Sequence, residues 1–86
     1  MNNYIVYLLI CSDDTFYCGI TNDILKRLRS HNSGKASKYT RGRLPVFLVC
    51  WSRSMSKSEA LKLEYKVKQI RSDRKIDFLN KHSGVI

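Results

Sequence analysis

The stretch that most constrains the fold runs from residue 4 to residue 21 and reads YIVYLLICSDDTFYCGIT. Two apolar runs rich in strand-forming residues flank four polar residues, which predicts a β-hairpin. The first run, about residues 3–11, is apolar at nearly every position, as expected for a central strand covered on both faces. The hairpin also carries Tyr4, Tyr7 and Tyr17, three of the five tyrosines in the chain. So many hydroxyls in the core of a hairpin require an explanation.

The faces of the two strands depend on the loop between them. A simple four-residue loop at 12–15 would pair Tyr7 with Ile20 and would place Tyr7 and Tyr17 on opposite faces of the sheet. A loop with an odd number of residues, or a bulge, would place both tyrosines on one face. A shared site for the two tyrosines therefore requires the second arrangement.

The rest of the chain predicts helices packed on a small sheet. Apolar runs, caps and spacing indicate a second strand at about 15–20, a helix at about 22–32, a strand at 44–51, a helix ending near residue 70 and a short helix at about 73–81. Ser56 and Glu59 form a capping-box pattern at the start of the long helix. The order β-β-α-β-α-α predicts an α+β (layered α/β) domain with a three-stranded antiparallel sheet.

Three further expectations concern local features. Ile24, Leu25 and Leu28 form the apolar stripe of the first helix. The segment 34–44 has no hydrophobic period and predicts a surface loop. We expect residues 1–86 to form a single domain with its core at about 4–80 and a loose tail from 82 to 86.

The charge of the chain is large and unevenly distributed. The formal net charge is +9, the first 21 residues contain only Asp13 and Asp14 as charged side chains, and all sixteen lysines and arginines follow them. This balance favours a polyanionic partner, first of all a nucleic acid. A membrane surface is less favoured because the long basic helix also carries Glu59 and Glu64, and nothing indicates a membrane span or a signal peptide.

The three cysteines indicate a reducing compartment. Cys11, Cys18 and Cys50 are odd in number, none forms a CxxC pair, and all lie in apolar runs. We therefore expect buried free thiols in a cytoplasmic protein, with neither a disulfide framework nor a zinc site.

Five side chains are candidates for chemistry, although each has an ordinary structural interpretation. A strand tyrosine usually packs with a wet hydroxyl, a helical arginine beside an apolar stripe usually extends to solvent, and a glutamate in a lysine-rich helix usually pairs at i,i+4. Arg27 and His31 lie four residues apart on one helix and can point to the same place. The candidates are Tyr7, Tyr17, Arg27, His31 and Glu64.

Taken together, these residues resemble the GIY-YIG nuclease superfamily. The resemblance rests on Val6-Tyr7 in a YxVYLL strand, on Tyr17-Cys18-Gly19, and then on Arg27, His31 and a single Glu64 in order along residues 4–80. It is closest to small stand-alone bacterial members, whose GxAxxT segment corresponds to Gly34, Ala36 and, one position later, Tyr39-Thr40. The first triplet departs from the family pattern as Ile5-Val6-Tyr7, and Asn80 is only a loose match to a terminal asparagine of the family.

The resemblance implies hydrolysis of phosphodiesters with one divalent metal ion, Mg²⁺ or Mn²⁺, held by Glu64. Tyr7 or Tyr17 would position or deprotonate the attacking water, Arg27 would bind phosphoryl oxygens, and His31 would relay a proton or hold the scissile phosphate. DNA is favoured over RNA as substrate, in a repair or recombination role with structure-directed or low-specificity cutting. A protein partner is also compatible with the sequence.

Basic and aromatic side chains of the first helix and the following loop would hold the nucleic acid on either side of the cut. Tyr39 could stack on a base, and the others could contact the backbone. These residues are Lys26, Arg29, Lys35, Lys38, Tyr39, Arg41 and Arg43. Two other interpretations stay open: a nucleic-acid-binding module with little or no turnover, and a basic adaptor for other proteins.

Overall fold

The computed structural model describes residues 3–83 and confirms the α+β fold. Its elements are β1 (Ile5–Ile10), β2 (Phe16–Thr21), α1 (Ile24–Asn32), α2 (Lys38–Arg41), β3 (Phe47–Trp51), α3 (Lys57–Gln69), the 3-10 turn η1 (Ser72–Arg74) and α4 (Lys75–Asn80). The strands form one antiparallel sheet in the order β2-β1-β3. The apolar first strand is therefore central, as its pattern predicted, and β2 has one free edge.

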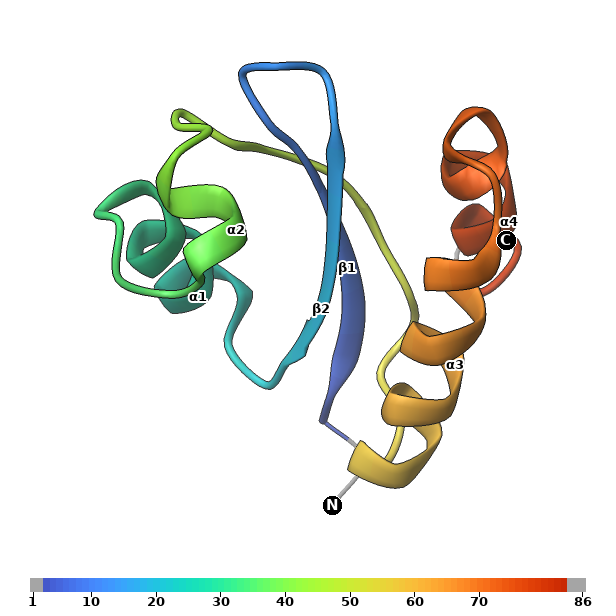
Figure 1. Cartoon of the computed structure of the whole chain (residues 1–86). Helices are drawn as coiled ribbons and strands as arrows, with labels where there is room; N and C mark the ends of the chain where they lie inside the picture. The colour runs from blue at the N-terminus through green and yellow to red at the C-terminus, as the bar shows by residue number, and fades with distance from the viewer. Residues whose placement is uncertain (1–2, 84–86) are drawn as a thin grey trace.

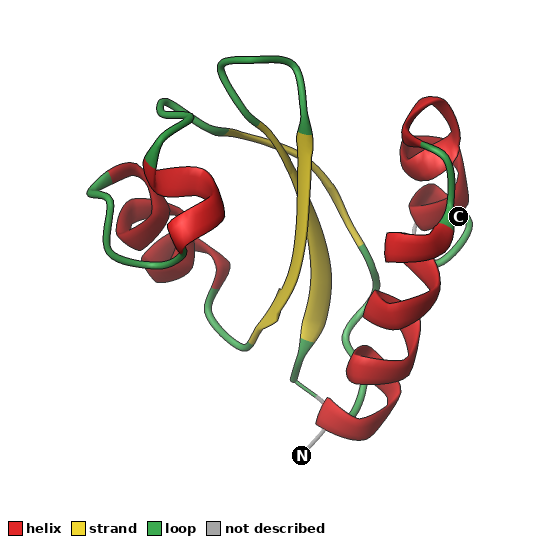
Figure 2. Ribbon diagram, in the orientation of Figure 1, coloured by secondary structure: helices red, strands yellow, loops and turns green. Residues whose placement is uncertain are grey.

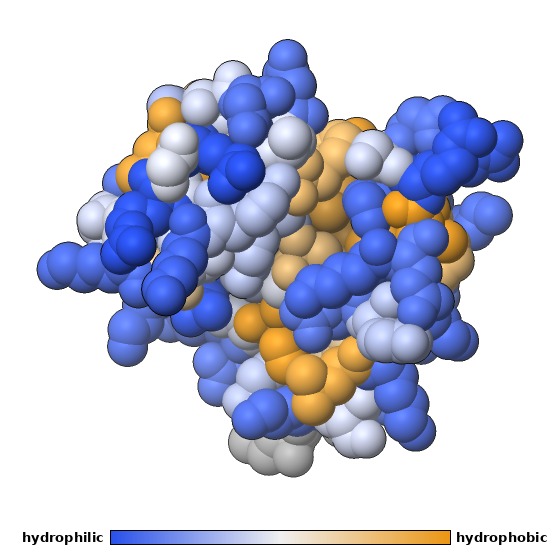
Figure 3. Space-filling view, viewed as in Figure 1, coloured by the Kyte–Doolittle hydropathy of each residue, from blue (hydrophilic) through white to orange (hydrophobic). Residues whose placement is uncertain are grey.

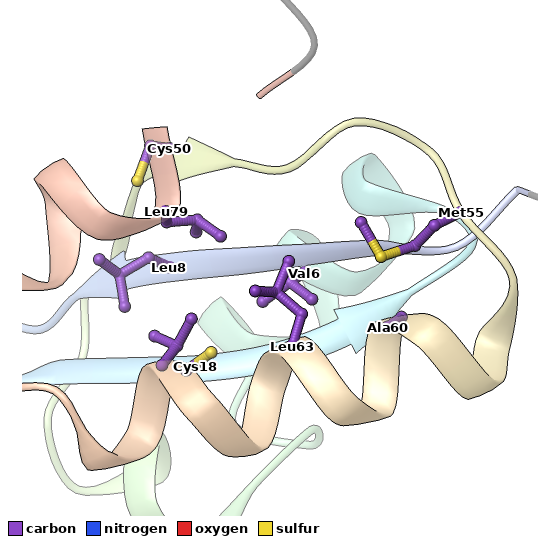
Figure 4. Close-up of a cluster of buried hydrophobic side chains, with 9 residues drawn as sticks. Val6, Leu8, Cys18, Cys50, Met55, Ala60, Leu63 and Leu79 are labelled. Atoms are coloured by element: carbon purple, nitrogen blue, oxygen red, sulfur yellow. The ribbon is translucent and has the colours of Figure 1, made fainter. Parts of the chain in front are cut away.

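Helices cover both faces of the sheet (Figure 1, Figure 2). On one face, α3 and α4 cover a core that includes Val6, Leu8, Cys18, Leu63 and Leu79 (Figure 4). On the other face lie α1 and α2, over a second core formed by the alternate residues of β1, Tyr7 and Leu9, together with Cys11 and Val46. Every second residue of a strand points to the same side, and this alternation divides β1 between the two cores.

The hairpin loop has five residues, so the four-residue loop is wrong and the odd-residue alternative is correct. Ile10 pairs with Phe16, which leaves residues 11–15 between the strands. The loop closes through a hydrogen bond from the Cys11 amide to the Thr15 carbonyl, 2.8 Å, and Asp14 takes a φ of 66°. Tyr7 consequently pairs with Gly19 and Leu9 with Tyr17. Both tyrosines therefore lie on the face covered by α1.

Local expectations for the helices are confirmed in part. The Ser56 and Glu59 capping box is present at the start of α3. Leu25, however, is 66% exposed and does not belong to the buried stripe of α1. The predicted loop at 34–44 contains the short helix α2, capped by the Ser37 side chain, which accepts a hydrogen bond from the Tyr39 amide.

His82, the first residue of the expected loose tail, packs against α4. His82 is half-buried against the Phe78 ring, and its amide donates to the Leu79 carbonyl. Residues 84–86 of the expected tail lie outside the described part of the chain. Cys11, Cys18 and Cys50 are buried and free. Within residues 3–83, no helix has the length and apolar character needed to cross a membrane.

Candidate active site

Tyr7 is the centre of a buried polar cluster between β1 and α1. Its side chain is fully buried, and its hydroxyl lies 2.8 Å from His31 Nε2 and 3.3 Å from Arg27 Nε. Arg27 and His31 lie one helical turn apart and do reach the same atom, as their spacing predicted. Gly19 leaves the space for this ring, because a Cβ there would stand 2.6 Å from the Tyr7 hydroxyl oxygen.

A directed chain of hydrogen bonds runs from Arg27 to α2. His31 Nδ1 lies 2.9 Å from Thr40 Oγ1, and the Thr40 hydroxyl donates to the Ser37 carbonyl at 3.4 Å. Because the Thr40 hydrogen is used there, we assign the His31 proton to Nδ1, which donates to Thr40. Nε2 then accepts from the Tyr7 hydroxyl, whose oxygen accepts from Arg27. Every member of the chain has one consistent role.

Burial shifts the acidities of this cluster. Burial, with a smaller contribution from the positive charge of Arg27, lowers the pKa of His31 to about 4, so the ring is neutral at pH 7. Burial raises the pKa of Tyr7 to about 12, although the hydrogen bond from Arg27 opposes this effect. The pKa of Arg27 is raised, first by its hydrogen bond to Tyr7. At neutral pH the tyrosine therefore holds its proton, with a neutral acceptor and a fixed cation beside its oxygen.

Tyr17 extends the cluster toward the surface. This half-buried side chain on β2 has its ring centroid 6.4 Å from that of Tyr7, 5.0 Å from that of His31 and 6.0 Å from that of Tyr39, on which it stacks. The Arg43 guanidinium lies 4.0 Å over the Tyr39 ring centroid. The two hairpin tyrosines thus share a site, one behind the other, and Tyr17 is the one that reaches solvent.

Glu64 lies in the other layer, on α3. Its half-buried side chain pairs with Lys68, Oε2 to Nζ 3.2 Å. Between Glu64 and the tyrosine cluster lies β2, and the negative charge of Glu64 is near enough to help burial raise the pKa of Cys18 to about 12. The four other candidates are thus brought together on one face of the sheet, whereas Glu64 approaches β2 from the opposite face.

A pocket at the free edge of β2, which we call the β2 pocket, connects the two layers. It has a volume of about 320 Å³, and Tyr17 and Tyr39 line it on one side of the strand while Lys68 and Lys75 line it on the other. Phe16, Leu8 and Cys18 complete its wall. Figure 3 shows an apolar hollow at this edge, with hydrophilic side chains on both sides. A ligand at the edge of β2 could therefore touch both layers at once.

The expected nucleic-acid-binding residues form one side of the molecule around α1 and α2. Five of the six basic residues are exposed, and they are Lys26, Arg29, Lys35, Lys38 and Arg41. Arg43 is instead half-buried and paired with Asp13 at 2.9 Å. Asn80 lies at the end of α4 and lines a hollow with residues of β3, the opposite edge of the sheet from Tyr17.

Three residues of the site were not singled out by the sequence as functional. Thr40 was noted only as part of a displaced GxAxxT match, yet it fixes the orientation of His31. Lys68 was expected only as an i,i+4 partner of Glu64, and Lys75 carried no signal beyond its charge, because nothing local shows that α3 and α4 bring them to the edge of β2.

The residues of the described part of the chain contain no cluster of three or more His, Cys, Asp and Glu side chains that could hold a metal ion. A metal ion that needs a full protein cage is therefore not matched by residues 3–83. Glu64 offers a single carboxylate, and Mg²⁺ in particular binds with one or two carboxylates, retained waters and substrate phosphates.

Residues 3–77 match the family of the GIY-YIG catalytic domain. This chain belongs to the GIY-YIG family. Tyr7, Gly19 and Tyr17 are the parts of the two family triplets that the sequence keeps, and in the structure they pack against one another. The nuclease family, and with it a nucleic acid as the general class of substrate, follows from this membership.

Several relatives of this chain are named as UPF0213 proteins. One from Bacillus velezensis is 43% identical over 78 residues, which cover 91% of this chain and 79% of the relative. The protein YsiG from Lactococcus lactis is 51% identical over 65 residues, and these span 62% of that protein.

Two solution NMR structures resemble this one. The UPF0213 protein BH0048 from Bacillus halodurans has a TM-score of 0.54 at 40% identity, with 94% of this chain and 86% of that chain covered. The protein EF2693 from E. faecalis has a TM-score of 0.62 at 35% identity, with 94% and 90% covered.

Proposed function

We propose that this protein is a divalent-metal-dependent endonuclease that hydrolyses phosphodiester bonds of DNA at the free edge of β2. The observation that carries the proposal is the array in which the Tyr7 hydroxyl contacts both Arg27 and His31, at 3.3 and 2.8 Å, directly behind Tyr17. A lone buried tyrosine would need one partner. The Tyr7 hydroxyl oxygen instead has two partners, the Arg27 cation and the neutral His31 ring. Such an arrangement suits a group that donates or relays a proton.

The roles of the side chains follow from their exposure. Tyr17 reaches solvent and would hold the attacking water. Tyr7 fixes Arg27 by accepting from its Nε, and the terminal nitrogens of the guanidinium would bind phosphoryl oxygens as charge builds on them. His31 is fully buried, so it would take a proton from the tyrosine side of the site. The alternative role of His31, holding the scissile phosphate, does not suit a side chain that has no solvent-accessible surface.

Glu64 would hold the metal ion, either Mg²⁺ or Mn²⁺. A half-buried carboxylate beside the β2 pocket fits an ion that keeps most of its waters and also binds the substrate. When bound there, the ion supplies Lewis acidity and neutralises phosphate charge. Lys68 must then release Glu64 Oε2 or share it.

The wider setting of the activity is also a proposal. The exposed basic side chains of α1 and α2 would contact the DNA backbone, and Tyr39 would stack on a base. We favour structure-directed or low-specificity cutting by residues 1–86 as one domain. The three buried free thiols suit the reducing cytoplasm.

A metal titration with a panel of nicked, branched, single-stranded and RNA substrates tests the proposal. At least one DNA substrate should be cut with Mg²⁺ or Mn²⁺. Glu64→Ala and Tyr7→Phe should each reduce cutting by about 100-fold or more while binding stays within a few-fold. Binding without cutting under every condition would favour a nucleic-acid-binding module, and binding that does not weaken with salt would favour a basic adaptor for proteins.

A further inference from the structure

The β2 pocket contains two lysines that the GIY-YIG residues do not account for. Lys68 on α3 and Lys75 at the start of α4 both line it, opposite Tyr17 and Tyr39. They come from the layer that holds Glu64, and Lys68 pairs directly with this proposed metal ligand. Phe16 and Leu8 contribute an apolar wall to the same pocket.

Lys75 is held in place before any ligand arrives. Its Nζ donates to the Val67 carbonyl at 2.7 Å, near the carboxyl end of α3, and its side chain is half-buried. Burial lowers the pKa of Lys75, with nearby Lys68 adding to the effect. An ammonium group has three donors, and one is used by Val67. The other two can bind an anion without a large loss of side-chain entropy.

Lys68 is placed to exchange one anion for another. Its present partner is the Glu64 carboxylate at 3.2 Å, and its own side chain is 55% exposed. An i,i+4 ion pair with an exposed lysine contributes little to stability in general, so a phosphate can replace the carboxylate as the partner of Lys68 at little cost. When a phosphate binds Lys68, the Glu64 carboxylate would lose this ion pair and become available to the metal ion.

We propose that the β2 pocket holds one nucleotide of the DNA strand next to the cut, with its phosphate bound by Lys68 and Lys75 and its sugar and base against Phe16 and Tyr39. The inference rests on the proposed nuclease function and adds to it the side chains that bind the strand on the α3 side. A nucleotide fits because the pocket combines an apolar and aromatic wall with two cations. It also continues directly into the site, since Tyr17 belongs to both.

The test titrates isotope-labelled protein with a short thymidine dinucleotide that carries a 5′-phosphate, and follows amide shifts by NMR. The shifts should be largest in β2 around Phe16 and Cys18 and at residues 68 and 75. Lys68→Gln and Lys75→Gln should each weaken the binding about tenfold. Lys75→Arg keeps a cation and a donor for Val67, so it should restore most of the affinity and guard against a loss of fold.

Lys62→Gln and Lys66→Gln are the matched controls. They remove the same charge from α3, the helix that carries Lys68, but these side chains line a different hollow, with Arg53 and Glu59. Equal weakening by both pairs of substitutions, or dinucleotide shifts outside the β2 pocket, would overturn the inference even if the protein cuts DNA. Shifts in the pocket that require Lys68 and Lys75 support it even if no substrate is cut. Equal shifts with inorganic phosphate alone would also overturn it, because the nucleoside would then contribute nothing.

Discussion

Gly19 matters at the scale of a single residue because Tyr7 packs directly on it. A methyl group at this position would lie 2.6 Å from the Tyr7 hydroxyl oxygen and 2.8 Å from Cζ, closer than atoms can pack. We expect Gly19→Ala to displace the ring from Arg27 and His31. The substitution should lower the free energy of unfolding by about 1–3 kcal/mol and reduce cutting.

Gly42→Ala is the control for this prediction, since a Cβ at that position would meet nothing within 4 Å. Urea unfolding and a cutting assay on the two variants make the comparison. If Gly19→Ala behaves like Gly42→Ala in both measurements, Gly19 does not hold Tyr7 in place.

His31 should make stability depend on pH in a known direction. The pKa of His31 is lowered to about 4 in the folded protein, against about 6.5 in an unfolded chain. The unfolded state therefore binds a proton first as the pH falls. The contribution of His31 to stability is fully present only well above pH 6.5, and we expect stability to fall by about 2 kcal/mol between pH 7 and pH 5.

Urea unfolding at a series of pH values measures this slope. Aspartates and glutamates titrate mostly below this range, so the comparison is confined to pH 5–7. His31→Gln should have a nearly flat profile there, and His82→Gln should keep the slope because it retains His31. A profile that stays unchanged in His31→Gln would contradict the assignment.

At the scale of elements, the capping box stabilises the start of α3, the helix that contains Glu64 and Lys68. The Ser56 hydroxyl accepts from the Glu59 amide, and a Glu59 carboxylate oxygen accepts from the Ser56 amide, both at 3.1 Å. Ser56→Ala should cost about 1 kcal/mol in urea unfolding. Ser58→Ala, two residues into the helix, is exposed and should have little effect. Equal effects of the two substitutions would show that the cap is not stabilising α3.

The sequence predicts the elements well where the signal is local. The capping box, the uninterrupted apolar pattern of β1 and the caps before α1 are all encoded within a few residues, and the structure confirms them. The four-residue helix α2 was missed because one turn has no hydrophobic period. Leu25 was wrongly assigned to the buried stripe because it is apolar and lies beside Ile24 in the sequence. Ile24 and Leu28 are half-buried in the structure, whereas Leu25 is exposed.

The meeting of Tyr7 and Tyr17 on one face depended on the number of residues in the hairpin loop. Four or five loop residues are equally compatible with the composition around Asp13 and Asp14, but they place Tyr7 and Tyr17 on opposite faces or on one. The position of Glu64 across the sheet was equally inaccessible, since it depends on how α3 packs. The sequence thus shows which residue types a site could use, whereas strand register and helix packing decide whether their side chains lie close together.

At the scale of the whole molecule, basic side chains occur in both helical layers, and the strands of the sheet between them carry no charge. One cationic wall is formed by Lys68 and Lys75, which line the β2 pocket at the free edge of β2. The other is formed by the exposed lysines and arginines in and between α1 and α2, on the other face of the sheet. The lysines and arginines of both layers would neutralise phosphates of a DNA strand along that edge, and this releases counterions that are condensed on the DNA. Removing cations from either wall should therefore weaken binding, whereas removing cations elsewhere should not.

Lys35→Gln combined with Lys38→Gln tests the cationic wall around α1 and α2, since Lys35 lies between the two helices and Lys38 begins α2. If each lysine contacts one phosphate, the slope of log affinity against log salt concentration should become shallower by about one for each lysine removed. Cutting at saturating DNA should persist, because neither side chain belongs to the Tyr7 cluster. Lys62→Gln combined with Lys66→Gln makes the same change in net charge on a surface away from the β2 pocket. Equal changes of slope in the two pairs, measured by fluorescence anisotropy, would mean that DNA responds to the total charge of the protein and not to an oriented edge.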